Sequence, residues 1–152
     1  MKLTDKQKRR AAIILVLILA TTAFIFWNST LSRGDSGDTS SSLYERLFPF
    51  FYAVFGRVPL SHEAFRKLAH FAEFGLLGLL YSLLAKVVQK EKLQDRINIG
   101  FIGFFTAFCD ETIQIFSSRG PEIRDVWIDV SGFLCGMIVL TLLVGVIRLF
   151  RK

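Results

Sequence analysis

Four long apolar stretches limit what this chain can fold into. They cover residues 11–32, 68–85, 97–118 and 127–147, and each is long enough to cross the roughly 30 Å hydrocarbon core of a bilayer as a helix. Hydrophobic residues make up 52% of the chain, which is more apolar surface than one small globular core hides. The sequence therefore predicts an all-α integral membrane protein, with four transmembrane helices in a single domain over residues 1–152.

The connection between the first two stretches contains two different segments. Residues 28–46 are polar, and we expect them to form an external linker. Residues 47–55 are aromatic, interrupted by Pro49 and too short to span, which predicts an interfacial or re-entrant segment. The basic flank before residue 11 also suits a signal peptide. We expect an uncleaved anchor instead, because the small residues at 20–23 lie in the middle of the apolar stretch.

Lysine and arginine are unevenly distributed among the connections. Of the 19 in the chain, five precede residue 11, four lie between residues 86 and 96, and three follow Ile147. A four-span topology places these three segments on one side, and cytoplasmic segments carry the excess of basic residues. Both termini are therefore expected in the cytoplasm. The net charge of +6 sits at helix ends rather than on one polar surface, so no nucleic-acid binding is expected.

Polar residues fall near the outer ends of the second, third and fourth stretches. Counted at about 1.5 Å per residue from the inner basic anchors, they lie roughly 20 to 28 Å across the membrane. Within each helix they are spaced three or four residues apart, which puts them on one face. Since ionisable groups in a membrane face the bundle interior or a water-filled pocket, we expect one polar pocket facing the outer leaflet. Its residues are His70, Glu73, Asp110, Glu111, Gln114 and Asp129.

Two kinds of chemistry would use such a pocket. His70 beside Glu73 forms an acid/base pair, since imidazole titrates near neutrality and a carboxylate fixes its tautomer. Asp110, Glu111 and Asp129 form a candidate site for a divalent cation, which would screen a phosphate and activate water. The candidate catalytic residues are thus His70, Glu73, Asp110 and Glu111, and the candidate substrate-binding residues at and around the mouth are Lys67, Gln114, Arg119, Arg124 and Asp125.

A structural role accounts for the same residues in another way. His70 and Lys67 would neutralise the carboxylates and hold the helices together without any ligand. The glycines of the fourth stretch, Gly132 and Gly136, with Gly75 and Gly78 of the second, are small residues that allow helices to approach closely. We expect these glycines to pack the bundle rather than to form a dimer.

Three motifs occur in a fixed order in the second half of the chain. They are R-K-L-A-H-F-A-E-F at residues 66–74, D-E-T-I-Q at residues 110–114 with Arg119 following, and D-x-x-x-D-x-x-G-x-x-x-G from Asp125 to Gly136. In order and spacing they resemble the VanZ-like family of small bacterial polytopic membrane proteins. The resemblance covers about half of the chain. It implies a cell-envelope protein, since the namesake of the family is associated with resistance to the glycopeptide teicoplanin.

The chain also departs from the pattern of that family. Phe74 stands where the family often has Tyr, which removes one hydroxyl donor. Asp129 stands where the family usually has Asn, which makes this pocket more acidic. Ser117 and Ser118 precede Arg119 where Pro-Gly is commoner.

The function expected first is action at the outer leaflet on, or together with, an anionic lipid-linked headgroup or cell-wall precursor. As an enzyme, the protein would be an intramembrane headgroup hydrolase or transferase. A non-catalytic module that binds precursor, glycopeptide or a partner and alters access to the cell wall would use the same pocket. A cation or proton pathway is a third alternative, and it is disfavoured because the inner halves of the spans lack polar residues.

The distribution of basic residues makes a direct prediction about topology. In a background without Cys109 and Cys135, cysteine substituted at Ser36 or Ser118 should react with an impermeant thiol reagent added outside the cell. Cysteine at Gln94 should react only after the membrane is opened. The reverse labelling pattern would contradict both the orientation and the placement of the pocket at the outer leaflet.

Overall fold

A computed structural model describes residues 3–30, 52, 61–117 and 122–150 of the 152-residue chain. These residues form four long helices, α1 (Asp5–Thr30), α3 (His62–Val87), α4 (Leu93–Phe116) and α5 (Ile123–Phe150). All four are long and apolar enough to cross a membrane, which confirms the predicted all-α membrane fold. The expected segment at residues 47–55, apart from residue 52, and most of the linker at residues 28–46 lie outside the described residues.

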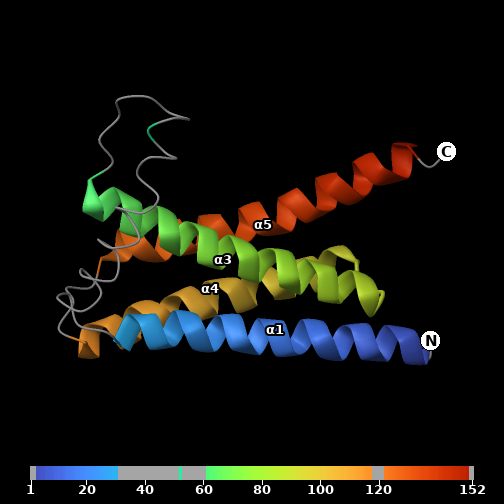
Figure 1. The fold of residues 1–152 in the computed structure, drawn as a ribbon, viewed down its shortest axis with the longest axis horizontal. Helices are drawn as coiled ribbons and strands as arrows, with labels where there is room; N and C mark the ends of the chain where they lie inside the picture. The colour runs from blue at the N-terminus through green and yellow to red at the C-terminus, as the bar shows by residue number, and fades with distance from the viewer. Residues whose placement is uncertain (1–2, 31–51, 53–60, 118–121, 151–152) are drawn as a thin grey trace.

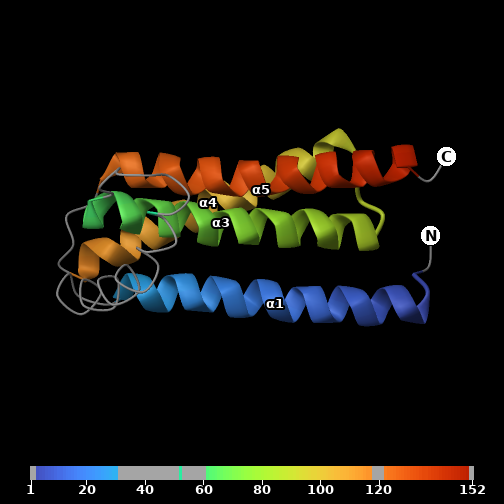
Figure 2. The same ribbon diagram turned by 45° about the horizontal axis from the view of Figure 1, so that its top comes forward.

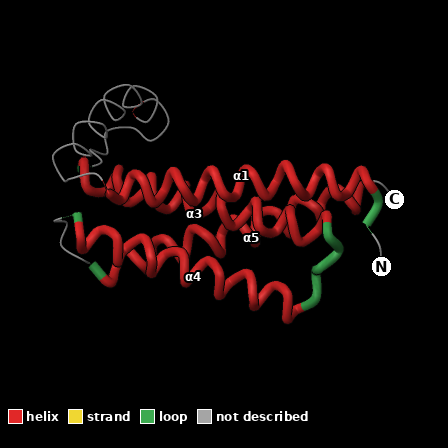
Figure 3. Tube along the Cα trace, turned by 90° about the horizontal axis from the view of Figure 1, so that it is seen from below, coloured by secondary structure: helices red, strands yellow, loops and turns green. Residues whose placement is uncertain are grey.

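The four helices run alternately in opposite directions, so that both chain termini lie at the same end of the bundle (Figure 1). α3 lies between α1 and α5 (Figure 2) and contacts the other three helices. A short connection joins α3 to α4 (Figure 3). We call the end that carries the two termini the terminal end, and the opposite end the far end.

All four helices begin before the apolar stretches, because polar residues that favour or cap a helix precede these stretches. α1 begins at Asp5 and includes the basic residues from Lys6 to Arg10, since Lys, Arg and Gln are good helix formers. α3 begins after Ser61, whose hydroxyl accepts a hydrogen bond from the backbone N–H of Ala64 at 3.1 Å. The Asp95 carboxylate accepts the backbone N–H of Lys92 at 3.2 Å at the start of α4. The apolar stretches therefore mark the hydrocarbon-crossing parts of longer helices.

Large apolar side chains cover the outside of the bundle. Phe101 and Phe105 on α4 are 68% and 66% exposed, and Leu142 on α5 is 63% exposed. A soluble monomer rarely exposes so much contiguous apolar surface, whereas lipid chains solvate it well. The buried core is correspondingly small and includes Phe74 and Phe133.

Glycines bring α3 and α5 into direct backbone contact. A Cβ atom added at Gly132 would meet the backbone carbonyl of Phe71, and one added at Gly136 would meet the carbonyl of Gly75. A Cβ atom at Gly78 would meet the carbonyl of Phe133. Small residues allow helices in membranes to pack this closely, so the expected packing role of these glycines is confirmed.

This contact predicts that Gly136→Val strongly destabilises the bundle. The new side chain would press on backbone atoms of α3 that cannot rotate away, and overpacking of this kind costs about 1–3 kcal/mol or more. Gly145→Val is the matched control on the same helix, because a Cβ atom there meets nothing within 4 Å. Denaturant unfolding in detergent micelles, followed by circular dichroism, measures the difference. Equal stability of the two variants would contradict the close packing of α3 on α5.

Candidate functional site

Polar side chains from all four helices meet inside the far end of the bundle. All of them are buried except Glu73, which is half-buried. We call this group the polar cluster. It consists of Ser29 on α1, His70 and Glu73 on α3, Asp110, Glu111 and Gln114 on α4, and Asp129 on α5.

Asp110 lies at the centre of the polar cluster and is fully buried. One of its carboxylate oxygens accepts a hydrogen bond from the Ser29 hydroxyl at 2.5 Å, which joins α4 to α1. The other oxygen accepts the Gln114 side-chain amide at 2.9 Å, one turn along the same helix. Hydrogen bonds to an ionised acceptor are about twice as strong as neutral ones. Asp110 is therefore held in one orientation by partners on two helices.

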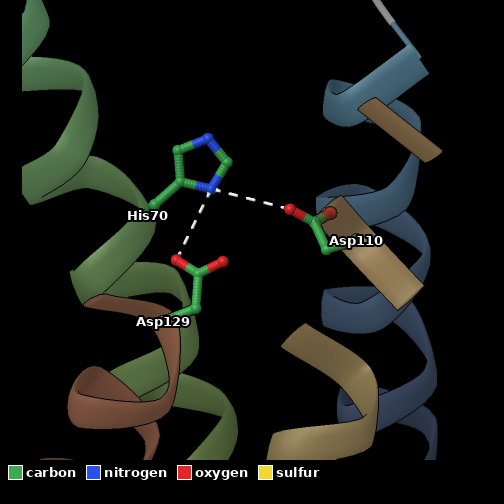
Figure 4. A group of neighbouring side chains, drawn as sticks. All are labelled: His70, Asp110 and Asp129. Atoms are coloured by element: carbon green, nitrogen blue, oxygen red, sulfur yellow. Dashed lines mark ion pairs between the residues drawn. The ribbon is translucent and has the colours of Figure 1, made fainter. Parts of the chain in front are cut away.

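His70 and Asp129 face each other across the contact between α3 and α5. The His70 Nδ1 atom lies 3.9 Å from an oxygen of Asp129 and 3.9 Å from an oxygen of Asp110. In Figure 4 this nitrogen points toward both carboxylates, and the second ring nitrogen points away from them. Asp129 is only 1% exposed, and no hydrogen bond from the described residues reaches either of its carboxylate oxygens.

Glu111 is bound to the start of α5. One of its carboxylate oxygens accepts the backbone N–H of Glu122 at 2.6 Å. A carboxylate at a helix N-terminus satisfies a free N–H group and interacts favourably with the helix dipole. The Oε2 atom of Glu111 and the Oε2 atom of Glu73 are buried and accept no hydrogen bond from the described residues.

Charged residues lie around the mouth of the polar cluster, and we call them the rim. The Lys67 ammonium is within ion-pair distance of three carboxylates, at 3.0 Å from Glu63, 3.2 Å from Glu122 and 3.4 Å from Asp125. The Arg66 guanidinium lies 3.6 Å from Asp125. A narrow recess opens between rim and cluster, without free volume for a water molecule between the described residues that line it, and its walls are Lys67, His70, Gln114, Asp125, Ile128 and Asp129.

Most of the candidate site residues from the sequence come together in this arrangement. Arg124 is the exception among the described residues, since it is exposed and forms no ion pair with them. Arg119 lies outside the described residues. The ligand atoms of His70, Asp110 and Asp129 lie within 4.8 Å of one another, a set that includes His70 in place of Glu111. The catalytic, binding and metal-binding roles assigned from the sequence stay predictions.

Sequence reasoning missed three participants, Ser29, Arg66 and Glu122. Ser29 lies where the first predicted span, residues 11–32, overlaps the predicted linker, residues 28–46, and the predicted pocket does not include it. A depth count from Arg10 at about 1.5 Å per residue places it roughly 28 Å across the membrane, level with Gln114. The sequence does not predict the ion pair of Arg66, because its partner Asp125 is distant in sequence. The sequence also does not predict the role of Glu122, because this role depends on the path of the connection between α4 and α5.

A larger pocket lies at the terminal end, far from the polar cluster. Its volume is about 240 Å³, and it lies between α3, α4 and α5. Its lining includes the basic side chains of Lys86, Arg96 and Arg148 and apolar side chains such as Met137 and Leu140. Volume alone would favour this pocket over the recess at the far end as the candidate functional site. The acid/base groups and the buried carboxylates are at the far end, so the candidate site is placed there.

Chemically, the far end offers buried acceptors beneath a ring of paired charges. The cluster contains four carboxylates and one imidazole, and the rim adds two basic side chains that form ion pairs with rim carboxylates. Such a site can accept hydrogen bonds, bind a cation, or transfer a proton through the imidazole.

Comparison with known proteins agrees with the motifs. Residues 13–144 match the VanZ/LLP1 family, which confirms the resemblance and extends it to α1. Neither the curated proteins nor the solved structures contain a match. With four membrane-spanning helices and a family match over most of its length, this multi-pass membrane protein belongs to the VanZ/LLP1 family.

Proposed function

We propose that the far end of the bundle binds the headgroup of an anionic, lipid-linked amphiphile, such as a cell-wall precursor, at the outer leaflet. The observation that carries this proposal is the convergence of buried polar side chains from all four helices beneath a charged rim. Burying a carboxylate costs several kcal/mol unless it is well paired, and ionisable groups within membrane spans commonly serve function. The assignment to the outer leaflet rests on the excess of basic residues at the terminal end.

The rim would bind the phosphate part of the headgroup. Lys67 already interacts with three carboxylates, two of which, Glu63 and Glu122, are 64% and 44% exposed. A phosphate that approaches from the membrane surface would replace these two solvated carboxylates as the partner of Lys67. Charge-assisted hydrogen bonds to phosphate are strong and orient the group that they bind.

The polar cluster would bind the uncharged or cationic part of the headgroup. Glu73 and Glu111 each have a buried carboxylate oxygen without a hydrogen bond from the described residues. Such acceptors fit hydroxyl, amide and ammonium donors, which sugars and peptides attached to a lipid phosphate present. Entry would require lining side chains such as Lys67 to move, because the recess that leads to His70 has no free volume between the described residues that line it. Rearrangement of interface side chains on binding is common.

Catalysis on the bound headgroup is the first form of the proposal. The Nδ1 atom lies 3.9 Å from each of two carboxylates, which is too far for a hydrogen bond, so their negative charge would stabilise the protonated ring. The second ring nitrogen, which points away from them (Figure 4), would transfer the proton, since imidazole is a common general acid/base. The reaction would be hydrolysis or transfer at the headgroup.

A binding module without catalysis is the second candidate, and a specific observation favours it. Asp110 and Glu111 are both hydrogen-bonded to structural partners, Ser29 and the backbone of Glu122. These bonds preorganise the cluster and do not require a reaction. In either form, occupying or changing a cell-wall precursor would alter the access of a glycopeptide such as teicoplanin to its target.

The rim contacts predict that Lys67→Gln weakens binding of a polyprenyl-diphosphate-linked sugar about tenfold or more. A hydrogen bond to a charged group contributes about 1.5–3 kcal/mol, and 1.4 kcal/mol corresponds to a factor of ten. Titration of a fluorescent derivative into protein in neutral-lipid nanodiscs measures the affinity. Lys8→Gln is the matched control, since Lys8 is also ion-paired at 3.0 Å, to Asp5, but lies at the terminal end. Equal losses in both variants, or equal binding of the polyprenyl alcohol, would contradict the proposal.

The two forms of the proposal predict different lipid compositions. If the protein is an enzyme, cells that make the wild type should accumulate a distinct lipid-linked product at the outer leaflet, and cells that make His70→Gln should not. Mass spectrometry of extracted lipids, at equal membrane levels of both proteins, is the measurement. Tight binding of the precursor with identical lipid profiles would exclude the enzyme and leave the binding module.

A further inference from the structure

Three side chains on three different helices gather around one point in the polar cluster. The Nδ1 atom of His70 lies 3.9 Å from an oxygen of Asp110 and 3.9 Å from an oxygen of Asp129. All three residues are buried, and the two aspartates are 0% and 1% exposed. Figure 4 shows the three groups directed toward each other.

We propose that His70, Asp110 and Asp129 bind a divalent metal ion of the first transition row, such as Zn²⁺ or Mn²⁺. Metal–ligand distances for such ions are about 2.0–2.2 Å for imidazole nitrogen and carboxylate oxygen. Ligand atoms at that distance from a common ion stand roughly 3 to 4 Å apart, depending on the angle between the bonds. The two separations from Nδ1, 3.9 Å each, fall within this range, and the three ligand atoms all lie within 4.8 Å of one another, so a small movement of one aspartate would complete the site.

The distances fit a shared ion better than direct bonding among the three groups. At 3.9 Å, the separations between the imidazole nitrogen and the oxygens are too long for hydrogen bonds. Both oxygens of Asp129 lack a hydrogen bond from the described residues, although the side chain is fully buried. A buried carboxylate with unused acceptors is costly, and a bound cation would give it a partner.

Charge in the cluster also favours a cation. Among the described residues, His70 is the one group within ion-pair distance of Asp129. The bases of the rim are already engaged, since Lys67 pairs with Glu63, Glu122 and Asp125. A divalent ion bound by two aspartates and a neutral imidazole would balance the charge of its ligands.

Two hydrogen bonds fix the orientation of the Asp110 carboxylate, as metal binding requires. The Ser29 hydroxyl and the Gln114 amide each donate to one of its carboxylate oxygens. A carboxylate oxygen has two lone pairs, so it can accept one such hydrogen bond and also bind an ion. Ligating carboxylates in proteins are typically held by outer-shell hydrogen bonds of this kind.

The ligand types decide the class of ion. One imidazole with two carboxylates suits Zn²⁺, Mn²⁺ or Fe²⁺, whereas Ca²⁺ and Mg²⁺ prefer oxygen ligands and more of them. Three protein ligands leave coordination positions open, as in catalytic rather than structural zinc sites. His70 and Asp129 also line the recess, so an open position would face the route to the membrane surface.

The test uses the full chain, purified without a histidine tag and without added lipid ligand, so its outcome does not depend on the headgroup proposal. Wild-type protein loaded with Zn²⁺ or Mn²⁺ and then desalted should retain about one ion per chain by elemental analysis. Its melting temperature should rise with Zn²⁺ or Mn²⁺ more than with the same concentration of Mg²⁺ or Ca²⁺. X-ray absorption of the zinc-loaded protein should show nitrogen and oxygen ligands that include imidazole.

Matched variants separate a coordinated ion from general attraction to a negative cluster. Asp129→Asn should weaken binding at least about 100-fold, because it removes a ligand, and Ser29→Ala should weaken it about 10-fold through the orientation of Asp110. Glu73→Gln removes the same charge from the same cluster but lies outside the group of three, so it should change the affinity less than Ser29→Ala does. Without metal, Asp129→Asn should melt at or above the temperature of the wild type, since the buried charge is gone.

Several results would overturn the proposal. Wild-type protein that retains no ion and shows no shift with any of the four cations excludes the site. Equal affinity of the wild type and Asp129→Asn, or equal losses in Glu73→Gln and Asp129→Asn, would show that these three side chains do not coordinate the ion. If Asp129→Asn fails to fold, the X-ray absorption spectrum decides, and a zinc spectrum without imidazole refutes the assignment.

Discussion

The hydrogen bond between Ser29 and Asp110 connects the first helix to the chemistry of the far end. Asp110 is fully buried in a membrane-spanning bundle, where an unpaired carboxylate would be very costly. Its two oxygens are satisfied by α1 through Ser29 and by α4 through Gln114, and His70 on α3 lies next to it. The Asp110 carboxylate of α4 thereby contacts or lies next to side chains of α1 and α3 at the depth where the site forms. Loss of this residue would remove one of the two hydrogen bonds of Ser29 to the α4 region as well as change the site, and the bond from the Ser117 hydroxyl to the Ser29 carbonyl at 2.9 Å would remain.

The contact between α3 and α5 sets the rest of the geometry. Gly132 lies three residues after Asp129, and it packs on the backbone carbonyl of Phe71, which follows His70. The absence of a side chain at Gly132 therefore brings the two helices together right beside the pair formed by His70 and Asp129. A larger residue would separate this pair, even though it would touch neither side chain. Packing and chemistry at the far end consequently depend on the same small residues.

The sequence predicts the fold and much of the composition of the site. Apolar stretches of about 20 residues require spanning helices, because backbone polar groups in lipid must be bonded within the helix. Helical spacing then places His70 with Glu73, and Asp110 with Gln114, on inward faces. The pairing between helices does not follow from spacing, since it depends on rotation about each helix axis. For this reason the sequence paired His70 with Glu73, while the structure places its Nδ1 atom between two aspartates.

Glu111 illustrates why neighbouring carboxylates have different roles. Adjacent residues on a helix point about 100° apart, so Asp110 and Glu111 point in different directions within the polar cluster. Asp110 points into the bundle toward Ser29, while Glu111 reaches the first turn of α5 through the backbone of Glu122. The D-E pair thus combines an interior acceptor with a cap that fixes where α5 begins. Because α5 carries Asp129 less than two turns later, Glu111 anchors the end of the helix that brings Asp129 to His70, while the close contacts at Gly132 and Gly136 hold α5 against α3.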